Sequence, residues 1–298
     1  TSIGKKTVTI VCGGSNLAEG QLVVVALPGA KVRWHGEGEL ITLEKTTIRG
    51  VESFGMICGA SEVGLSEMFP PIDSHEIVDL SSLAVKAGTS LASALGFDDT
   101  SLEFEVTSNR PDMMCAEGIA RELSAIEGKK FEPHEPAKMK EGNDELTVTI
   151  KDPELCPRYQ AVAMSGIEMK QSPVWMQSRL RVAGIRPINV IVDIGNYVML
   201  EIGEPLHAFD GENVSEIVVR RAKKGELIAA LDGKEYDLDP KMLVIADAKK
   251  PIAIAGVMGS QSSGITDTTK NIIWEAAAFD PVSIRKTARG LLIFSESA

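Results

Sequence analysis

Four polar residues able to bind a ligand or do chemistry lie close together in one stretch of the sequence. Arg186, Asp193, Asn196 and His207 fall within 22 residues, around an apolar helix expected to end at Gly203. Polar groups beside a core must be hydrogen-bonded or they destabilise it, so bracing of the turns explains Asp193 and Asn196 as well as function does. Arg186 and His207 flank the helix on turns, where ligand-contacting residues concentrate. Binding or catalysis is therefore the favoured role for these two.

A second candidate is the glycine-containing turn at residues 254–260. Gly256 and Gly259 allow close backbone approach, which suits binding of a ligand through main-chain amides. No Lys-Ser/Thr pair follows, so the turn is not a P-loop, and it does not match the dinucleotide fingerprint. A plain tight turn is the alternative.

Glu275 is the third candidate, because it places a carboxylate within the apolar run at residues 272–277. A glutamate in such a strand is seldom left unpaired. It either meets a cation of the structure or faces a polar cavity, and the residues alone leave both alternatives open.

These candidates must be positioned by a chain of 298 residues, a length that favours two packed units over one. Hydrophobic residues make up 44% and charged residues 24%, as in an ordinary soluble globular protein. No apolar run approaches the roughly 20 residues needed to span a bilayer, and residues 1–7 do not resemble a secretory signal. A cytoplasmic location without membrane contact is the expectation.

Charge and cysteine usage narrow the possible partners. The net charge of −11 argues against an indiscriminate nucleic-acid binder, so no DNA partner is expected and any RNA contact must be local. Residues 1–50 carry six Lys/Arg against four Asp/Glu, which makes this the more basic end. The four cysteines are scattered without C-x-x-C pairs, so free thiols and no metal site are expected.

The first part of the chain has the pattern of a small β domain. Strand-like runs at residues 7–11 and 21–27 are separated by Gly13-Gly14 and stopped by Pro28-Gly29. After it, Asn109-Arg110-Pro111-Asp112 predicts a turn and a helix with Ile119, Leu123 and Ile126 on one face, ended by Gly128. Residues 129–143 contain Pro133 and Pro136 and have the composition of a linker.

The second part alternates strands with helices and is predicted to be α+β. Strands are expected at residues 146–150, 216–219 and 243–245. One helix is expected to be capped by Ser172-Pro173 and to bury Met176, Leu180 and Ala183 before Gly184. Another is expected from Asp280-Pro281 to Gly290.

Together these residues resemble a known family. The run from Arg158 through residues 172–175, 184–189, 196–198 and 207–210 to Gly259 is similar to the editing domain of the phenylalanyl-tRNA synthetase β subunit. Residues 10–16, 25–29, 49–56 and 62–65 resemble the tRNA-binding oligonucleotide-fold (OB-fold) domain that precedes it in bacterial members. Residues 107–122, around Asn109-Arg110-Pro111-Asp112, are similar to the connecting scaffold. The resemblance covers nearly the whole chain.

The resemblance implies a multidomain fold. An all-β OB-fold barrel lacking its first strand is expected at residues 1–97, a short α+β scaffold and linker at 98–143, and an α+β editing domain at 144–298. Because the first strand and the later domains of the family have no counterpart here, the chain is interpreted as a fragment. It is expected to have no synthetic active site and to hold no cofactor, since ATP and magnesium belong to the complete synthetase.

The resemblance also implies a function and a set of site residues. Such a domain hydrolyses tyrosine misattached to phenylalanine tRNA. An apolar pocket discriminates against an added hydroxyl by only about 10²-fold, so a second sieve is needed. Glu275 is expected to accept a hydrogen bond from the tyrosine hydroxyl. His207 and Arg186 are expected to be catalytic residues that position the terminal adenosine and the ester for attack by a water molecule. The rest of the expected pocket is Gly195, Pro205, Ala255, Gly256, Gly259, Ser295 and Ser297.

Partners and one alternative follow from the same resemblance. Phenylalanine tRNA and the synthetase α subunit are the expected partners, in an α2β2 heterotetramer. At three places the chain differs from the family pattern: Gly195 replaces a threonine, Ser260-Gln261 replaces Gly-Glu, and residues 295–298 replace Thr-Glu-Ala-Ser. The alternative function is a non-catalytic fragment that binds tRNA and braces the assembly.

Overall fold

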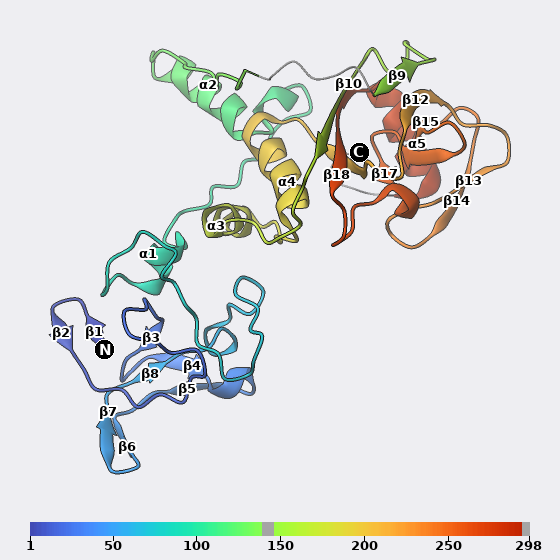
Figure 1. The fold of residues 1–298 in the computed structure, drawn as a ribbon. Helices are drawn as coiled ribbons and strands as arrows, with labels where there is room; N and C mark the ends of the chain where they lie inside the picture. The colour runs from blue at the N-terminus through green and yellow to red at the C-terminus, as the bar shows by residue number, and fades with distance from the viewer. Residues whose placement is uncertain (139–145, 294–298) are drawn as a thin grey trace. The chain divides into compact units, whose positions relative to one another are not determined.

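The computed structural model describes residues 1–138 and 146–293, and the chain divides into two compact units (Figure 1). Unit 1 consists of Thr1–Ser101 and Pro173–Gly184, and unit 2 of Leu102–Ser172 and Ile185–Ala298. Residues 173–184 thus pack with the N-terminal unit although the sequence on either side belongs to unit 2. This two-way division does not test the predicted boundaries at 97/98 and 143/144, which stay a prediction. Within the described ranges no helix is long and apolar enough to cross a bilayer.

Unit 1 is built from short antiparallel strand pairs. Its strands are β1 (Ser2–Ile3), β2 (Lys6–Thr7), β3 (Val25–Ala26), β4 (Lys31–Arg33), β5 (Leu40–Thr42), β6 (Thr46–Ile48), β7 (Val51–Ser53) and β8 (Met56–Ile57). They pair as β1-β2, β3-β8, β4-β5 and β6-β7. Residues 1–101 therefore contain strand pairs but no closed barrel.

The predicted strand at residues 7–11 is wrong beyond Thr7. Phe54 N–H donates to Thr9 O, but Val11 N–H donates to the Ser53 hydroxyl. Because a side-chain oxygen takes the place of a backbone carbonyl, a regular ladder does not form there.

The helices of unit 1 are short, and both pack on its core. The helical elements of unit 1 are the 3-10 turns η1 (Trp34–Gly36) and η2 (Ser61–Val63) and the helices α1 (Leu91–Leu95) and α3 (Val174–Val182). As predicted, α3 buries Met176 and Leu180. The predicted N-cap is wrong by one residue, because Pro173 occupies the N-cap position and its side chain makes no capping hydrogen bond. Ala183, which was expected to be buried, is exposed.

Unit 2 contains two packed sheets and a separate two-stranded antiparallel sheet, β13-β14. A three-stranded antiparallel sheet has the order β10-β18-β11, and a five-stranded sheet has the order β17-β16-β15-β12-β9, in which only the β9-β12 pair is parallel. The strands are β9 (Thr147–Ile150), β10 (Arg158–Ser165), β11 (His207–Asp210), β12 (Glu216–Arg221), β13 (Glu226–Ala229), β14 (Glu235–Leu238), β15 (Leu243–Ala246), β16 (Pro251–Ile254), β17 (Met258–Gly259) and β18 (Asn271–Ala278). The three strands predicted in this region are confirmed as β9, β12 and β15.

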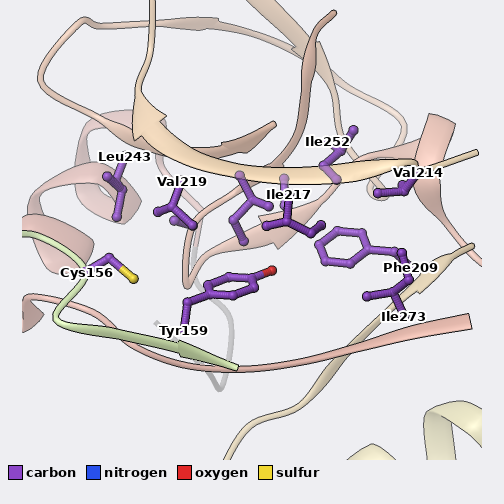
Figure 2. Close-up of a cluster of buried hydrophobic side chains, with 12 residues drawn as sticks. Cys156, Tyr159, Phe209, Val214, Ile217, Val219, Leu243, Ile252 and Ile273 are labelled. Atoms are coloured by element: carbon purple, nitrogen blue, oxygen red, sulfur yellow. The ribbon is translucent and has the colours of Figure 1, made fainter. Parts of the chain in front are cut away.

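The hydrophobic core of unit 2 lies between these sheets (Figure 2). Tyr159 and Phe209 from the three-stranded sheet pack with Ile217, Val219 and Ile252 from the other sheet. Figure 2 shows the Tyr159 ring among these side chains, with its hydroxyl pointing away from Cys156. A polar group in such a core requires a partner.

The helical elements of unit 2 are the 3-10 turns η3 (Pro111–Met113) and η4 (Gln261–Ser263) and the helices α2 (Ala116–Ile126), α4 (Val190–Ile202) and α5 (Pro281–Leu291). The α4 helix begins where the Asn189 side chain accepts from two backbone N–H groups, and it ends at Gly203 with φ 82°, as predicted. The α5 helix starts after its predicted cap, Asp280, but it includes Gly290 and ends at Leu291, which corrects the expected end. In α2, Leu123 and Ile126 are 49% and 72% exposed.

Candidate functional site

A cavity of about 720 Å³ lies within unit 2. It is bordered by the start of β11, the turn between β16 and β17, the β18 strand and α5. Its volume falls in the range of small-molecule sites, roughly 300 to 1,000 Å³. Most of its lining is apolar, so the few polar side chains there determine what it binds.

Glu275 is one of these polar residues. It lies on β18, the middle strand of the three-stranded sheet, directly opposite His207 on β11 and Ala161 on β10. Residues directly opposite in an antiparallel pair share a face of the sheet, which brings Glu275 and His207 together at the cavity. Glu275 is only 6% exposed, so its carboxyl group has little access to bulk water.

The partner of Glu275 is a phenol of the chain itself. Tyr159 Oη donates a hydrogen bond to Glu275 Oε2 at 2.9 Å. Tyr159 is buried and does not border the cavity, whereas Glu275 does. No Lys, Arg or His ion pair with Glu275 occurs among the described residues. The cation alternative is therefore wrong for the described residues: the buried carboxyl accepts from a neutral donor and borders the cavity.

Burial controls the protonation of this pair. It raises the pKa of Glu275 to about 8, and the hydrogen bond from Tyr159 opposes that rise, while the charge of Glu204 adds to it. The pKa of Tyr159 is raised by burial and by the charge of Glu275. At neutral pH most Glu275 side chains are therefore protonated, and the carboxyl can donate as well as accept.

His207 provides the second polar group. Its Nε2 atom is buried and has no hydrogen-bond partner among the described residues, and the ring stacks edge-on against Phe209 with centroids 4.5 Å apart. Burial lowers the pKa of His207 to about 4, so the imidazole is neutral at physiological pH. A buried ring nitrogen without a partner is uncommon in folded proteins, and its position beside the cavity makes a bound ligand or water the natural partner.

Three more of the predicted site residues border the same cavity. Pro205, Gly256 and Gly259 border the cavity with His207 and Glu275. Gly256 has φ 63°, a left-handed conformation that favours glycine. The structure thus brings together five of the expected residues.

Three further residues do not border the cavity. Ala255 is fully buried in the core, and Arg186 is exposed on the turn before α4. Gly195 is buried on α4, where an added Cβ would lie 3.5 Å from Leu206 O and 3.6 Å from the Trp274 ring. Ser295 and Ser297 lie outside the described residues.

Asp193 has a structural role in this geometry. It accepts hydrogen bonds from the Ser172 hydroxyl and, at 2.8 Å, from Ile188 N–H. These bonds fix the turn that carries Arg186, in agreement with the bracing alternative for Asp193.

Sequence reasoning missed three polar residues that border the cavity or bond to its lining. Tyr159 is 116 positions from Glu275 in the sequence, so no local sequence pattern predicts their contact. Arg285 and Arg289 border the cavity from α5. Their spacing of four residues on a helix predicted from Asp280-Pro281 could have revealed them, because such residues lie on the same helix face.

Comparison with known proteins gives consistent similarities. Residues 155–298 match the model of the B3/4 domain. The chain is 45% identical over 297 residues to the phenylalanine–tRNA ligase β subunit of Moorella thermoacetica, and 42% identical over 302 residues to that of Carboxydothermus hydrogenoformans. Each alignment covers 97% of this chain and 36% of the relative, so the chain spans about a third of the length of these curated relatives.

A solved structure is also similar, but distantly. It is an N-terminal fragment of the phenylalanyl-tRNA synthetase β subunit from Pyrococcus horikoshii, with 18% identity and a TM-score of 0.37. The match covers 62% of this chain and 57% of that one.

Proposed function

The chain belongs to the phenylalanine–tRNA ligase β-subunit family, and from this membership we propose that its B3/4 domain hydrolyses tyrosine wrongly esterified to phenylalanine tRNA. In this proposal the chain is part of a cytoplasmic synthetase. Ligation itself belongs to the complete enzyme with its α subunit, in an α2β2 assembly that uses ATP and magnesium. The proposal assigns the cavity of unit 2 to the hydrolytic step.

One observation carries this assignment: the buried Nε2 of His207, without a partner among the described residues, and the buried carboxyl of Glu275 lie opposite each other at a single cavity. Burying two polar groups at one apolar cavity is unfavourable unless a ligand or water completes their hydrogen bonds. A purely structural cavity would be expected to be lined by apolar groups.

Glu275 supports selection of tyrosine over phenylalanine. A ligand phenol can donate to or accept from this carboxyl, whereas a phenyl ring can do neither. A site built to hydrogen-bond a hydroxyl rejects the analogue lacking it by up to about 10⁴- to 10⁵-fold, because a buried polar group is then left unsatisfied. The apolar lining, including Val257 and Phe279, suits the aromatic ring.

The side chains present favour attack by water. The described residues that border the cavity include no Ser, Thr, Cys or Lys to act as a nucleophile. A histidine with a pKa near 4 is a weak base at neutral pH. His207 would therefore hold the water or the ester by a hydrogen bond, and stabilise the geometry of attack, rather than remove a proton completely.

Arg285 and Arg289 support delivery of the substrate by an RNA. Both are exposed and lie one helical turn apart on α5, and neither side chain makes a hydrogen bond or ion pair with residues 1–138 or 146–293. Guanidinium groups bind phosphate oxygens well. At the edge of the cavity they would hold phosphates near the acceptor end of the tRNA.

The proposal assigns a tRNA-binding role to unit 1. The paired strands of residues 1–57 and the basic balance of residues 1–50 agree with an OB-fold domain. This assignment rests on family membership and not on a closed barrel.

A second candidate function is non-catalytic tRNA binding and scaffolding. It is favoured by one observation: neither Arg186 nor Gly195 borders the cavity. If those positions are essential to hydrolysis, the cavity as it stands is incomplete.

Deacylation of tyrosyl- and phenylalanyl-tRNA by the complete synthetase distinguishes the two functions. We expect faster loss of tyrosine, and a drop of at least about 10²-fold for His207→Ala, as for removal of one stabilising donor in a hydrolytic site. His75→Ala is the matched control, because His75 is exposed in unit 1, and it should hydrolyse at the wild-type rate. Equal, uncatalysed loss of both amino acids would establish the scaffolding function instead.

A further inference from the structure

The Tyr159–Glu275 hydrogen bond joins the core of unit 2 to its cavity. Tyr159 is 9% exposed and belongs to the hydrophobic cluster between the two sheets. Glu275 borders the cavity, and Tyr159 does not. Tyr159 thus lies among the core side chains (Figure 2), and its phenol donates to the carboxyl of a residue that borders the cavity.

We propose that Tyr159 is a positioning residue for ligand recognition: it holds one oxygen of Glu275 from the core and directs the other toward a hydroxyl group on an aromatic ligand. This inference rests on the proposed function, and it adds a residue that determines specificity. Tyr159 itself touches no substrate. Its effect passes entirely through the orientation and protonation of Glu275.

The geometry of the two strands supports this role. Tyr159 is two residues from Ala161, the residue opposite Glu275, so it lies diagonally across the β10-β18 pair on the same face. Diagonal neighbours are about 7 to 8 Å apart at Cα, within reach of a long aromatic side chain. A glutamate has rotatable bonds that would otherwise let its carboxyl turn, and a second anchor removes that freedom.

The two carboxyl oxygens of Glu275 then have different hydrogen-bonding roles. With Oε2 occupied by the Tyr159 proton, the proton of a neutral Glu275 resides on Oε1. That oxygen can donate to a ligand hydroxyl without a buried charge. A ligand with no hydroxyl leaves this proton unpaired, which is the basis of the discrimination.

Several titratable and charged groups face Glu275 or the cavity that it borders, and of these Tyr159 and Glu204 shift its pKa. The groups are Tyr159 and Cys156 from the core side, His207 on β11, Glu204 before β11, and Arg285 and Arg289 on the cavity side. Of these, the Tyr159 hydrogen bond lowers the pKa of Glu275. Its removal should therefore move the pKa upward, an effect that a packing role alone would not produce.

Tyr159→Phe removes the phenol and retains the ring. In the complete synthetase, we expect the preference for tyrosyl- over phenylalanyl-tRNA hydrolysis to fall about tenfold, the equivalent of one hydrogen bond. We also expect the carboxyl of Glu275, followed by carbon-13 NMR, to titrate at higher pH than in the wild type. Tyr236→Phe is the matched control, since Tyr236 donates to Asp232 at 2.7 Å and neither borders the cavity; it should change neither quantity.

The outcomes separate the inference from the proposed function. A folded Tyr159→Phe enzyme with wild-type preference and an unchanged Glu275 titration would overturn the positioning role. A wild-type enzyme that hydrolyses neither ester would overturn the proposed function, while the titration would still test the coupling. If Tyr159→Phe does not fold, 3-fluorotyrosine at position 159 provides the test, because its more acidic hydroxyl should lower the pKa of Glu275. An unchanged pKa there would also refute the inference.

Discussion

Gly259 lies against the His207 ring so closely that a Cβ added to it would be 2.6 Å from Cε1 and 2.8 Å from Nε2. Gly259→Ala should therefore push the imidazole out of position, because β17 backbone cannot retreat easily from its partner β16. We expect a loss of stability of about 1–3 kcal/mol, typical of overpacking, and a larger proportional loss of tyrosyl-tRNA hydrolysis. Thermal unfolding and deacylation rates measure the two effects.

Gly13→Ala is the matched control for this substitution. Gly13 has ordinary backbone geometry, and an added Cβ there meets no atom within 4 Å. It should leave both quantities unchanged. If Gly259→Ala behaved in the same way, the close contact with His207 would have no functional importance.

His207 should make stability depend on pH. Its folded pKa of about 4 lies below the ordinary value of 6.5, so the unfolded state binds more protons between these values. The stability contribution is present above pH 6.5 and is lost as pH falls toward 4, with a slope of at most about 1.4 kcal/mol per pH unit. Denaturant unfolding at several pH values should show a shallower acid decline in His207→Gln, and an identical decline would contradict the burial of the imidazole.

Glu275 should act in the opposite direction. Its folded pKa of about 8 exceeds the ordinary value of 4.5, so the folded state retains a proton that the unfolded state releases. This contribution is present below pH 4.5 and is lost as pH rises through 8. Glu275→Gln retains an acceptor for Tyr159 but cannot titrate, so its stability should vary less with pH over this range. Chemical unfolding of the two proteins at pH 6 and pH 8.5 measures the difference.

Glu275→Ala should affect stability and specificity together. It deprives the buried Tyr159 hydroxyl of its partner, a loss of about 1–3 kcal/mol. It also removes the group assigned to the ligand hydroxyl. A variant with a normal melting temperature would contradict the Tyr159 contact, and one that retains the tyrosyl preference would contradict the assigned selectivity.

Local features of this fold could be predicted from the sequence because local chemistry determines them. Gly203 ends α4 in a left-handed conformation, and Asp280 caps α5 through Ser283 N–H. The gathering of His207, Glu275 and Gly259 was anticipated only through family resemblance. Their register across β11 and β18 joins residues far apart in sequence, and periodicity alone does not specify such pairing.

Other features depended on tertiary contacts that no short pattern contains. Ser172 was expected to cap α3, but its hydroxyl bonds Asp193 instead. Leu123 and Ile126 form the expected apolar face of α2, yet both are exposed. The Tyr159–Glu275 contact requires β10 and β18 to pair in one register. For Ser172 and Tyr159 a distant partner decides the outcome, and that partner is known only once the fold is known.

Arg285 and Arg289 provide the last test, which concerns how the substrate reaches the cavity. If each arginine neutralises one phosphate, the double variant Arg285→Gln with Arg289→Gln should bind tRNA more weakly. The slope of log K, the association constant for tRNA, against the log of the salt concentration should become shallower by about 0.7 per arginine, the value for single-stranded nucleic acid. Because phosphate contacts position the substrate and do not take part in bond breaking, KM should rise more than kcat falls. A small ester such as tyrosine ethyl ester has no phosphate, so its hydrolysis should be unaffected.

Lys249→Gln with Lys250→Gln is the matched control, because these exposed residues carry the same charge on the same unit but do not border the cavity. An equal effect of both pairs would indicate a general electrostatic attraction; loss of small-ester hydrolysis in the arginine variant would place these residues in the chemistry itself.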